Sequence, residues 1–206
     1  FGISTSAAMA VAPAAGLALA KQGYPLLFLA SAVLVTVAGL HVLPVGSRQA
    51  EAHPPVNGLG AFVLRSALFP SLVAGVSTLT YASVVFYIQE YALNFKLGSV
   101  AFQLFSRHFR IDIAGLFFTV LAVVLILTRG PLGKLSDRIG REWVIGGGLL
   151  FSAAGTMLLA AMPGRSILLL VAVIYGVGTA AVQPTLMALA ADRAAPARRG
   201  AAMGTY

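Results

Sequence analysis

The charged side chains that could do chemistry are few, and many of them gather in one short stretch. Only 10% of the 206 residues are Asp, Glu, Lys or Arg. Positions 129 to 142 nevertheless hold four cations and two acids: Arg129, Lys134, Asp137, Arg138, Arg141 and Glu142. Opposite charges this close in sequence favour ion pairs and charge-assisted hydrogen bonds. Because long apolar runs flank the stretch, we expect it to form a polar loop in water.

Other kinds of reaction centre find little support in the sequence. The three histidines are scattered without metal-ligand spacing, at His41, His53 and His108, and the chain has no Cys. A thiolate metal site and a disulfide framework are therefore excluded. The absence of a Gly-x-x-x-x-Gly-Lys-Ser/Thr loop argues against an ATP-driven pump. We expect no catalytic residue, no metal site and no cofactor, and hence a protein that is not an enzyme.

The composition is that of an integral membrane protein. Hydrophobic residues make up 59% of the chain, and its charged content is far below the roughly 25% of soluble domains. The apolar runs are about 17–25 residues long, the length of helix that crosses the hydrocarbon core of a bilayer. They lack the two-residue alternation of membrane β-strands. The predicted fold class is an all-α, multi-pass membrane protein in contact with lipid.

Six membrane spans and the start of a seventh are expected. They cover residues 3–20, 24–42, 69–92, 113–128, 143–162 and 166–191, and the last begins at 201. Between the second and third spans lies a polar linker whose Pro54-Pro55 pair resists helix formation. Residues 94–112 alternate aromatic with basic side chains and are too polar to span a bilayer. We therefore expect an interfacial segment or an extended helix end there.

The positions of Lys and Arg predict which side of the membrane each loop faces. With six crossings, the linker, the 129–142 stretch and the 192–200 loop fall on one side, which holds nine cations against five on the other. Short loops rich in Lys and Arg remain in the cytoplasm. The first side is therefore predicted to be cytoplasmic. The net charge of +8 is explained by topology, and no nucleic-acid partner is expected.

In the charged stretch the sequence resembles the major facilitator superfamily. The pattern Gly133-x-x-x-Asp137-Arg138-x-Gly140-Arg141 is similar to that superfamily's signature cytoplasmic loop, which occurs once in each half of a twelve-helix transporter. Such glycines permit a tight turn and close helix approach. The resemblance implies a charge network that holds a cytoplasmic gate in one state and breaks in the other. The alternative is an ordinary positive-inside loop.

The order of the spans indicates which copy of the loop this is. The polar linker resembles the central loop that joins the two six-helix halves, so the spans would be the fifth to tenth helices, with the eleventh beginning at the end. The chain then divides into two helices of the N-terminal half, a cytoplasmic linker and the C-terminal half: residues 1–43, 44–66 and 67–206. We expect a fragment that packs against missing N-terminal helices of the same transporter.

The first span carries a weaker match to one subtype. Ala12-Pro13-Ala14-Ala15-Gly16 is similar to the Gly-Pro-x-x-Gly core of the fifth-helix motif of drug:proton antiporters, with Ala in place of the first Gly. Pro13 would kink the helix, and Gly16 would let a partner backbone approach. A proline tolerated in an Ala-rich helix is the alternative.

Polar side chains within the spans are candidate substrate contacts, because such groups are costly in a bilayer. In this superfamily the seventh helix lines the central cavity, which implies the candidates Tyr81, Tyr87 and Gln89; Gln183, beside Pro184 in the 166–191 span, is a further cavity candidate. Packing between helices is the alternative for each aromatic. For Gln183 we favour a bond to the carbonyl freed by Pro184. Ser77, Thr78 and Thr80 are expected to bond to their own helix backbone.

The resemblance implies a secondary active transporter that moves a small molecule by alternating access, most simply proton-coupled efflux across a bacterial inner membrane. Proton coupling needs an acid whose protonation changes with access, and Glu90 is the candidate in this chain. We expect the main coupling acid in the preceding helices. The alternatives are a sugar or metabolite uptake permease on the same scaffold, and a membrane scaffold or sensor that does not transport.

Overall fold

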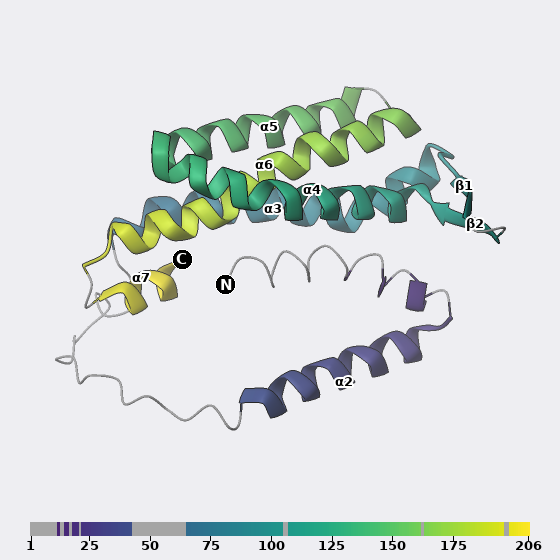
Figure 1. Cartoon of the computed structure of the whole chain (residues 1–206), viewed down its shortest axis with the longest axis horizontal. Coiled ribbons are helices and arrows are strands. Elements are labelled where there is room, and N and C mark those ends of the chain that lie inside the picture. The colour runs from purple at the N-terminus through teal and green to yellow at the C-terminus, as the bar shows by residue number, and fades with distance from the viewer. Residues whose placement is uncertain are drawn as a thin grey trace.

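A computed structural model describes residues 12, 15–16, 18–20, 22–42, 65–104, 107–161, 163–195 and 198–206. The helices and strands follow in the order α2 (Tyr24–Val42), α3 (Arg65–Asn94), β1 (Ser99–Leu104), β2 (Arg107–Asp112), α4 (Ile113–Ile139), α5 (Arg141–Ala161), α6 (Arg165–Asp192) and α7 (Arg199–Thr205) (Figure 1). Within these described ranges, α3, α4, α5 and α6 are each long and apolar enough to cross a membrane. The predicted helical membrane fold is confirmed.

Helix α6 lies at the centre of the bundle and packs chiefly against α5 and α4, with α3 along another side (Figure 1). Over half of its apolar segment is buried (56%), against 17% for α3. The core between these helices contains Phe117 and Leu121 of α4 with Leu168, Val171 and Tyr175 of α6, each at most 2% exposed. The outer faces stay apolar, which suits contact with lipid.

Small residues allow α5 and α6 to approach closely. A Cβ atom added to Gly148 of α5 would lie 2.8 Å from the Ala181 Cβ and 2.8 Å from the Val182 Cγ2 on α6. A Cβ added to Gly178 of α6 would lie 2.6 Å from the backbone oxygen of Gly148. Side chains at these two glycines would push the helices apart. The pair is held by the close backbone approach that small residues permit in membranes.

Most of the predicted polar loop is helical. Helix α4 continues to Ile139 and turns only at Gly140, where φ is +99°. Its 27 residues span about 40 Å at 1.5 Å per residue, more than the roughly 30 Å of hydrocarbon. The helix therefore continues beyond the predicted span end at residue 128, because a helix can extend into water, where charged side chains remain solvated; the span end itself stays a prediction.

Residues 99–104 and 107–112 form the two strands of a β-hairpin, so the expected extension of a helix end is wrong. β1 and β2 pair antiparallel, from Ser99 opposite Asp112 to Leu104 opposite Arg107. Helix α3 stops at Asn94, and the chain then takes positive φ values at Lys96 (51°) and Gly98 (70°). Left-handed residues end a helix.

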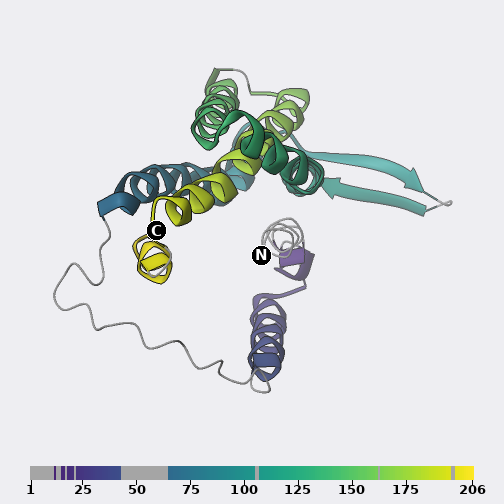
Figure 2. The same cartoon turned by 60° about the vertical axis from the view of Figure 1, so that its left-hand side comes forward.

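The N-terminal region is described in part. Helix α2 has the predicted bounds Tyr24–Val42, is mostly exposed, and lies apart from the α3 to α6 bundle (Figure 2). Pro13 and residues 44–64 of the predicted linker 44–66 lie outside the described residues, so the predicted kink and linker stay predictions; residues 65 and 66 already belong to α3. A Cβ at Gly16 would meet the Leu27 side chain at 4.0 Å, an ordinary contact rather than a close backbone approach.

Candidate gating network and membrane pocket

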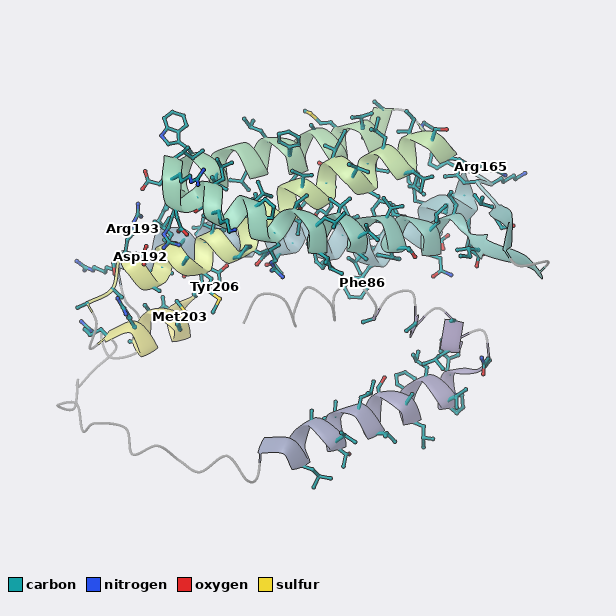
Figure 3. The ribbon with its side chains drawn as sticks, in the orientation of Figure 1. Phe86, Arg165, Asp192, Arg193, Met203 and Tyr206 are labelled. Carbon is teal, nitrogen blue, oxygen red and sulfur yellow. The ribbon has the colours of Figure 1, made fainter. Side chains whose placement is uncertain are left out.

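Two ion pairs join the start of α5 to the end of α6. The Arg141 Nε lies 2.6 Å from the Asp192 Oδ2, and the Arg193 Nη2 lies 2.5 Å from the Glu142 Oε1. Two adjacent residues at the start of α5 therefore pair with two adjacent residues at the end of α6. Each end supplies one acid and one cation. Figure 3 shows Asp192 and Arg193 at the end of the bundle where α7 begins. We call these four residues the crossed pairs.

The side chains of the crossed pairs are partly exposed to water, which limits the free energy that each ion pair contributes. The Arg141 and Asp192 side chains are 26% and 54% exposed, and those of Arg193 and Glu142 are 37% and 71% exposed. Ion pairs in such positions contribute about 0–1 kcal/mol each. Glu142 in the first turn of α5 and Arg193 after the last turn of α6 also complement the helix dipoles. Contacts of this strength can form and separate readily.

The rest of the loop motif lies on the last turns of α4. Gly133 has nothing within 4 Å of an added Cβ, so the close helix approach expected there is not seen among the described residues. Asp137 and Arg138 are exposed, and the described part of the chain provides no ion pair for either. Ser136, directly before Asp137, is 3% exposed, and its Oγ has no hydrogen-bond partner among the described residues.

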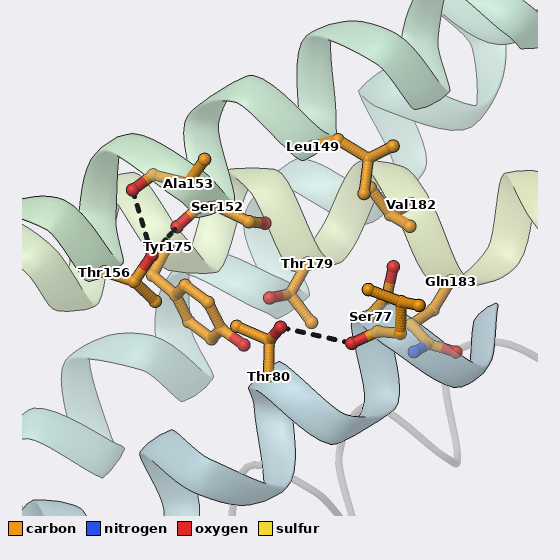
Figure 4. A pocket seen from close by; sticks show the side chains of 11 residues that line it. Ser77, Thr80, Leu149, Ser152, Ala153, Thr156, Tyr175, Thr179, Val182 and Gln183 are labelled. Atoms are coloured by element: carbon orange, nitrogen blue, oxygen red, sulfur yellow. Dashed lines mark hydrogen bonds between the residues drawn. The ribbon is translucent and has the colours of Figure 1, made fainter. Parts of the chain in front are cut away.

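A pocket of about 310 Å³ lies between α3, α5 and α6 (Figure 4). Its lining has seven polar residues: Ser77, Thr80, Ser152, Thr156, Tyr175, Thr179 and Gln183. The other four lining residues are Val76, Leu149, Ala153 and Val182. Among the described residues, no charged side chain lines the pocket. It therefore suits an uncharged or weakly hydrated molecule with both apolar and hydrogen-bonding groups.

Three of the pocket hydroxyls use their protons on their own helices. Ser77 donates to the Val73 carbonyl at 2.8 Å, Thr80 to the Val76 carbonyl at 3.1 Å, and Thr156 to the Ala153 carbonyl at 2.9 Å. The expectation for Ser77 and Thr80 is confirmed. A hydroxyl oxygen that donates in this way can still accept a bond. The pocket thus offers acceptors to a ligand that carries N–H or O–H donors.

A family model of the Major Facilitator Superfamily matches residues 91–206, from the end of α3 to the last residue. The chain belongs to the Major Facilitator Superfamily. No curated protein and no solved structure gives a significant match. Members of the superfamily are membrane transporters and not enzymes. The pocket and the crossed pairs are accordingly features of a multi-pass transporter.

Gln183 is the predicted cavity residue that reaches the transporter's pocket. Its Nε2 donates to the Thr78 Oγ1 on α3 at 3.3 Å, and its backbone carbonyl accepts from the Tyr206 hydroxyl at 3.2 Å. The favoured role for the Gln183 amide, bonding to the carbonyl freed by Pro184, was wrong. Because α3 lies alongside α6, the amide finds a partner there instead. Thr78 likewise bonds across helices rather than to its own.

The other sequence candidates lie outside this pocket of the transporter. Tyr81 packs against the core between α3, α4 and α6, whereas Tyr87 is 68% exposed on the outer face of α3. Gln89 lines a separate pocket beside the base of the hairpin. Glu90 is exposed near the end of α3. The aromatic residues of one helix therefore do not converge on one site.

Four pocket residues of the transporter were not predicted: Ser152, Thr156, Tyr175 and Thr179. Each pair from one helix is spaced by four residues, which places both members on the same helix face. This i, i+4 spacing of polar groups within apolar spans was the available signal. The sequence shows that the pairs share a face, but not which neighbouring helix that face meets.

Proposed function

We propose that this chain is the fifth to tenth helices, and the start of the eleventh, of an alternating-access transporter. The proposal divides it into N-terminal helices, central linker and C-terminal half at 1–43, 44–66 and 67–206. We further propose proton-coupled export across a bacterial inner membrane. The superfamily match and the basic residues beside the loop motif support a cytoplasmic gate at that end.

The observation that carries the switching role is the geometry of the crossed pairs. They tie α5 to α6 directly after the loop motif, through Arg141 of the motif itself. In the proposed cycle the pairs hold the cytoplasmic end of this half together in one state and separate in the other. Gly140 turns the chain between α4 and α5, which positions Arg141. Asp137 and Arg138 are exposed, so they are open to partners from the other half.

The residues that line the pocket indicate what kind of substrate it can bind. We propose that Gln183 and the lining hydroxyls bind a small, amphipathic molecule that is neutral or carries a diffuse positive charge. The described lining residues offer acceptor oxygens and no charged group, so a strongly hydrated ion would lose its hydration without compensation. Glu90, exposed near the end of α3, is proposed as a coupling group of this chain. The main coupling acid is proposed to lie in the preceding helices.

The test is a charge reversal in the full protein, reconstituted in proteoliposomes with an imposed pH gradient. Arg141→Asp and Asp192→Arg should each abolish most substrate flux, because each leaves like charges facing one another. The double variant should recover a large part of it. Arg65→Gln, an exposed cation at the start of α3, is the matched control and should keep its flux.

Unchanged flux in both single variants, at normal protein levels, would refute the gating role. No substrate flux in any variant or in the original protein would favour a scaffold or sensor. The direction of substrate flux relative to proton flux distinguishes export from uptake. Proton-coupled export predicts that substrate and protons cross the membrane in opposite directions. Uptake in symport with protons would refute the efflux part and keep the transporter.

A further inference from the structure

We propose that the β1–β2 hairpin lies on the membrane surface, at the bundle end opposite the crossed pairs, and binds anionic lipid headgroups. Transport by alternating access accounts for the helices and the loop motif, but it gives no role to this hairpin. Four features of the hairpin support the proposal: the strand register, the contacts at its base, its direction relative to the helices and the charges around it. It is independent of the substrate and of the coupling ion.

The register divides the hairpin into two unlike faces. Val100 pairs with Ile111, Phe102 with Phe109 and Leu104 with Arg107. Because successive strand residues alternate sides, these six positions share one face. The other face carries Ser99, Ala101, Gln103, His108, Arg110 and Asp112. By residue type, the register positions of one face are thus apolar except for Arg107, and those of the other face are almost entirely polar.

The base of the hairpin shows which face is turned toward the membrane helices. Val100, from the apolar face, packs against the helical core. The Ile111 Cγ2, from the same face, lies 3.5 Å from a Cβ placed on Gly115 of α4. Asp112 of the polar face is exposed. The apolar face therefore begins on the membrane side of the hairpin and the polar face on the water side.

Contacts around residues 97 and 98 fix this orientation. Leu97 is 7% exposed within the core, and its carbonyl accepts a bond from the Arg165 Nε at the start of α6. The Ile113 amide of α4 donates to the Gly98 carbonyl at 3.2 Å. The hairpin is therefore attached to α3, α4 and α6 at its base.

The hairpin runs across the direction of the membrane helices. Figure 1 shows the bundle at full length and the hairpin foreshortened, whereas Figure 2 shows the hairpin extended away from the foreshortened helices. Since α3 and α4 cross the bilayer and the hairpin joins their ends, it lies near the headgroups. A hairpin in this direction follows the membrane plane rather than pointing into the water.

The charge at this end matches an anionic surface. Four cations lie on or beside the hairpin, namely Lys96, Arg107, Arg110 and Arg165, against the two acids Glu90 and Asp112. An amphipathic element with cations binds the interface through both apolar burial and attraction to anionic lipids. Long basic side chains can keep their charges at headgroup level. Lipid is therefore the occupant that fits the apolar face and the flanking cations together.

The experiment measures depth along the hairpin with nitroxide labels. The chain has no Cys, so single substitutions F102C and L104C on the apolar face, with A101C and Q103C as the matched controls, need no altered background. The full chain is reconstituted in vesicles of phosphatidylcholine with phosphatidylglycerol. Collisions with oxygen should exceed those with a water-soluble nickel chelate at 102 and 104, and the reverse should hold at 101 and 103.

Lipid charge is tested in the same variants. In pure phosphatidylcholine, the label at 104 should shift toward the water-exposed signal. After R107Q and R110Q it should shift in the same direction, by about fivefold in population for each cation removed. Equal nickel accessibility at all four positions would overturn the proposal by placing the hairpin in water. Low accessibility to both reagents at 102 and 104 would also overturn it, because a protein surface would then cover the face. Depth that is insensitive to lipid charge would refute the headgroup part.

Discussion

The two ends of the α3 to α6 bundle are held together by different kinds of contact. At one end the crossed pairs join α5 to α6 through side chains that stand partly in water. At the other end Leu97 is buried, a main-chain bond joins the hairpin base to α4, and the Arg165 side chain of α6 donates to the Leu97 carbonyl. The Tyr91 hydroxyl adds a bond from α3 to the Leu159 carbonyl of α5 at 2.8 Å.

The difference indicates where the transporter half can change shape. An exposed ion pair exchanges its partner for water at a cost of about 0–1 kcal/mol. A buried apolar side chain leaves a cavity if it withdraws, and a buried carbonyl loses a bond that lipid cannot replace. We therefore expect the crossed-pair end to open and close while the hairpin end keeps its contacts.

The largest expected effect comes from Leu97→Ala. Removing this buried side chain should lower the free energy of unfolding by about 2–5 kcal/mol, because the core cannot fill the space completely. Leu93→Ala is the matched control, since Leu93 is 64% exposed on α3, and it should change stability little. Thermal unfolding in detergent, followed by circular dichroism, measures both. Equal losses in the two variants would contradict a fixed hairpin end.

A smaller effect is expected from Gly148→Ala in α5. The added methyl group would lie 2.8 Å from Ala181 and Val182 atoms and should cost about 1–3 kcal/mol. Gly146→Ala is the control on the same helix, because nothing lies within 4 Å of its Cβ position. That variant should be neutral or slightly stabilising. Thermal unfolding of the pair tests whether α5 and α6 are held by this close approach.

The smallest effect on stability is expected from Glu142→Gln. Glu142 is the more exposed partner of Arg193, so the loss should stay below about 1 kcal/mol. Substrate flux should nevertheless change, because the balance between open and closed states depends on differences of this size. A large fall in the unfolding temperature would show that the crossed pairs stabilise the fold rather than control a switch.

The sequence by itself determined the membrane class, the helical spans and the family resemblance. These depend on local properties: the length of an apolar run sets whether it can cross a bilayer, and the spacing in Gly133-x-x-x-Asp137-Arg138-x-Gly140-Arg141 lies within one segment. The charged stretch was also identified correctly as the place where α4 meets α5. Its helical state was missed, because outside the bilayer a charged segment forms helix or loop according to its neighbours.

Tertiary structure alone decided the partners. Arg141 stood out in the sequence, but its contact with Asp192 requires α5 and α6 to end side by side. Gln183 was a candidate, whereas Thr156 and Thr179 became visible only when three helices surrounded one pocket. The hairpin required residues 99 and 112 to find each other. The apolarity and charge of each segment follow from its residues alone. A contact between distant residues depends on how the elements pack, and that is a property of the whole fold.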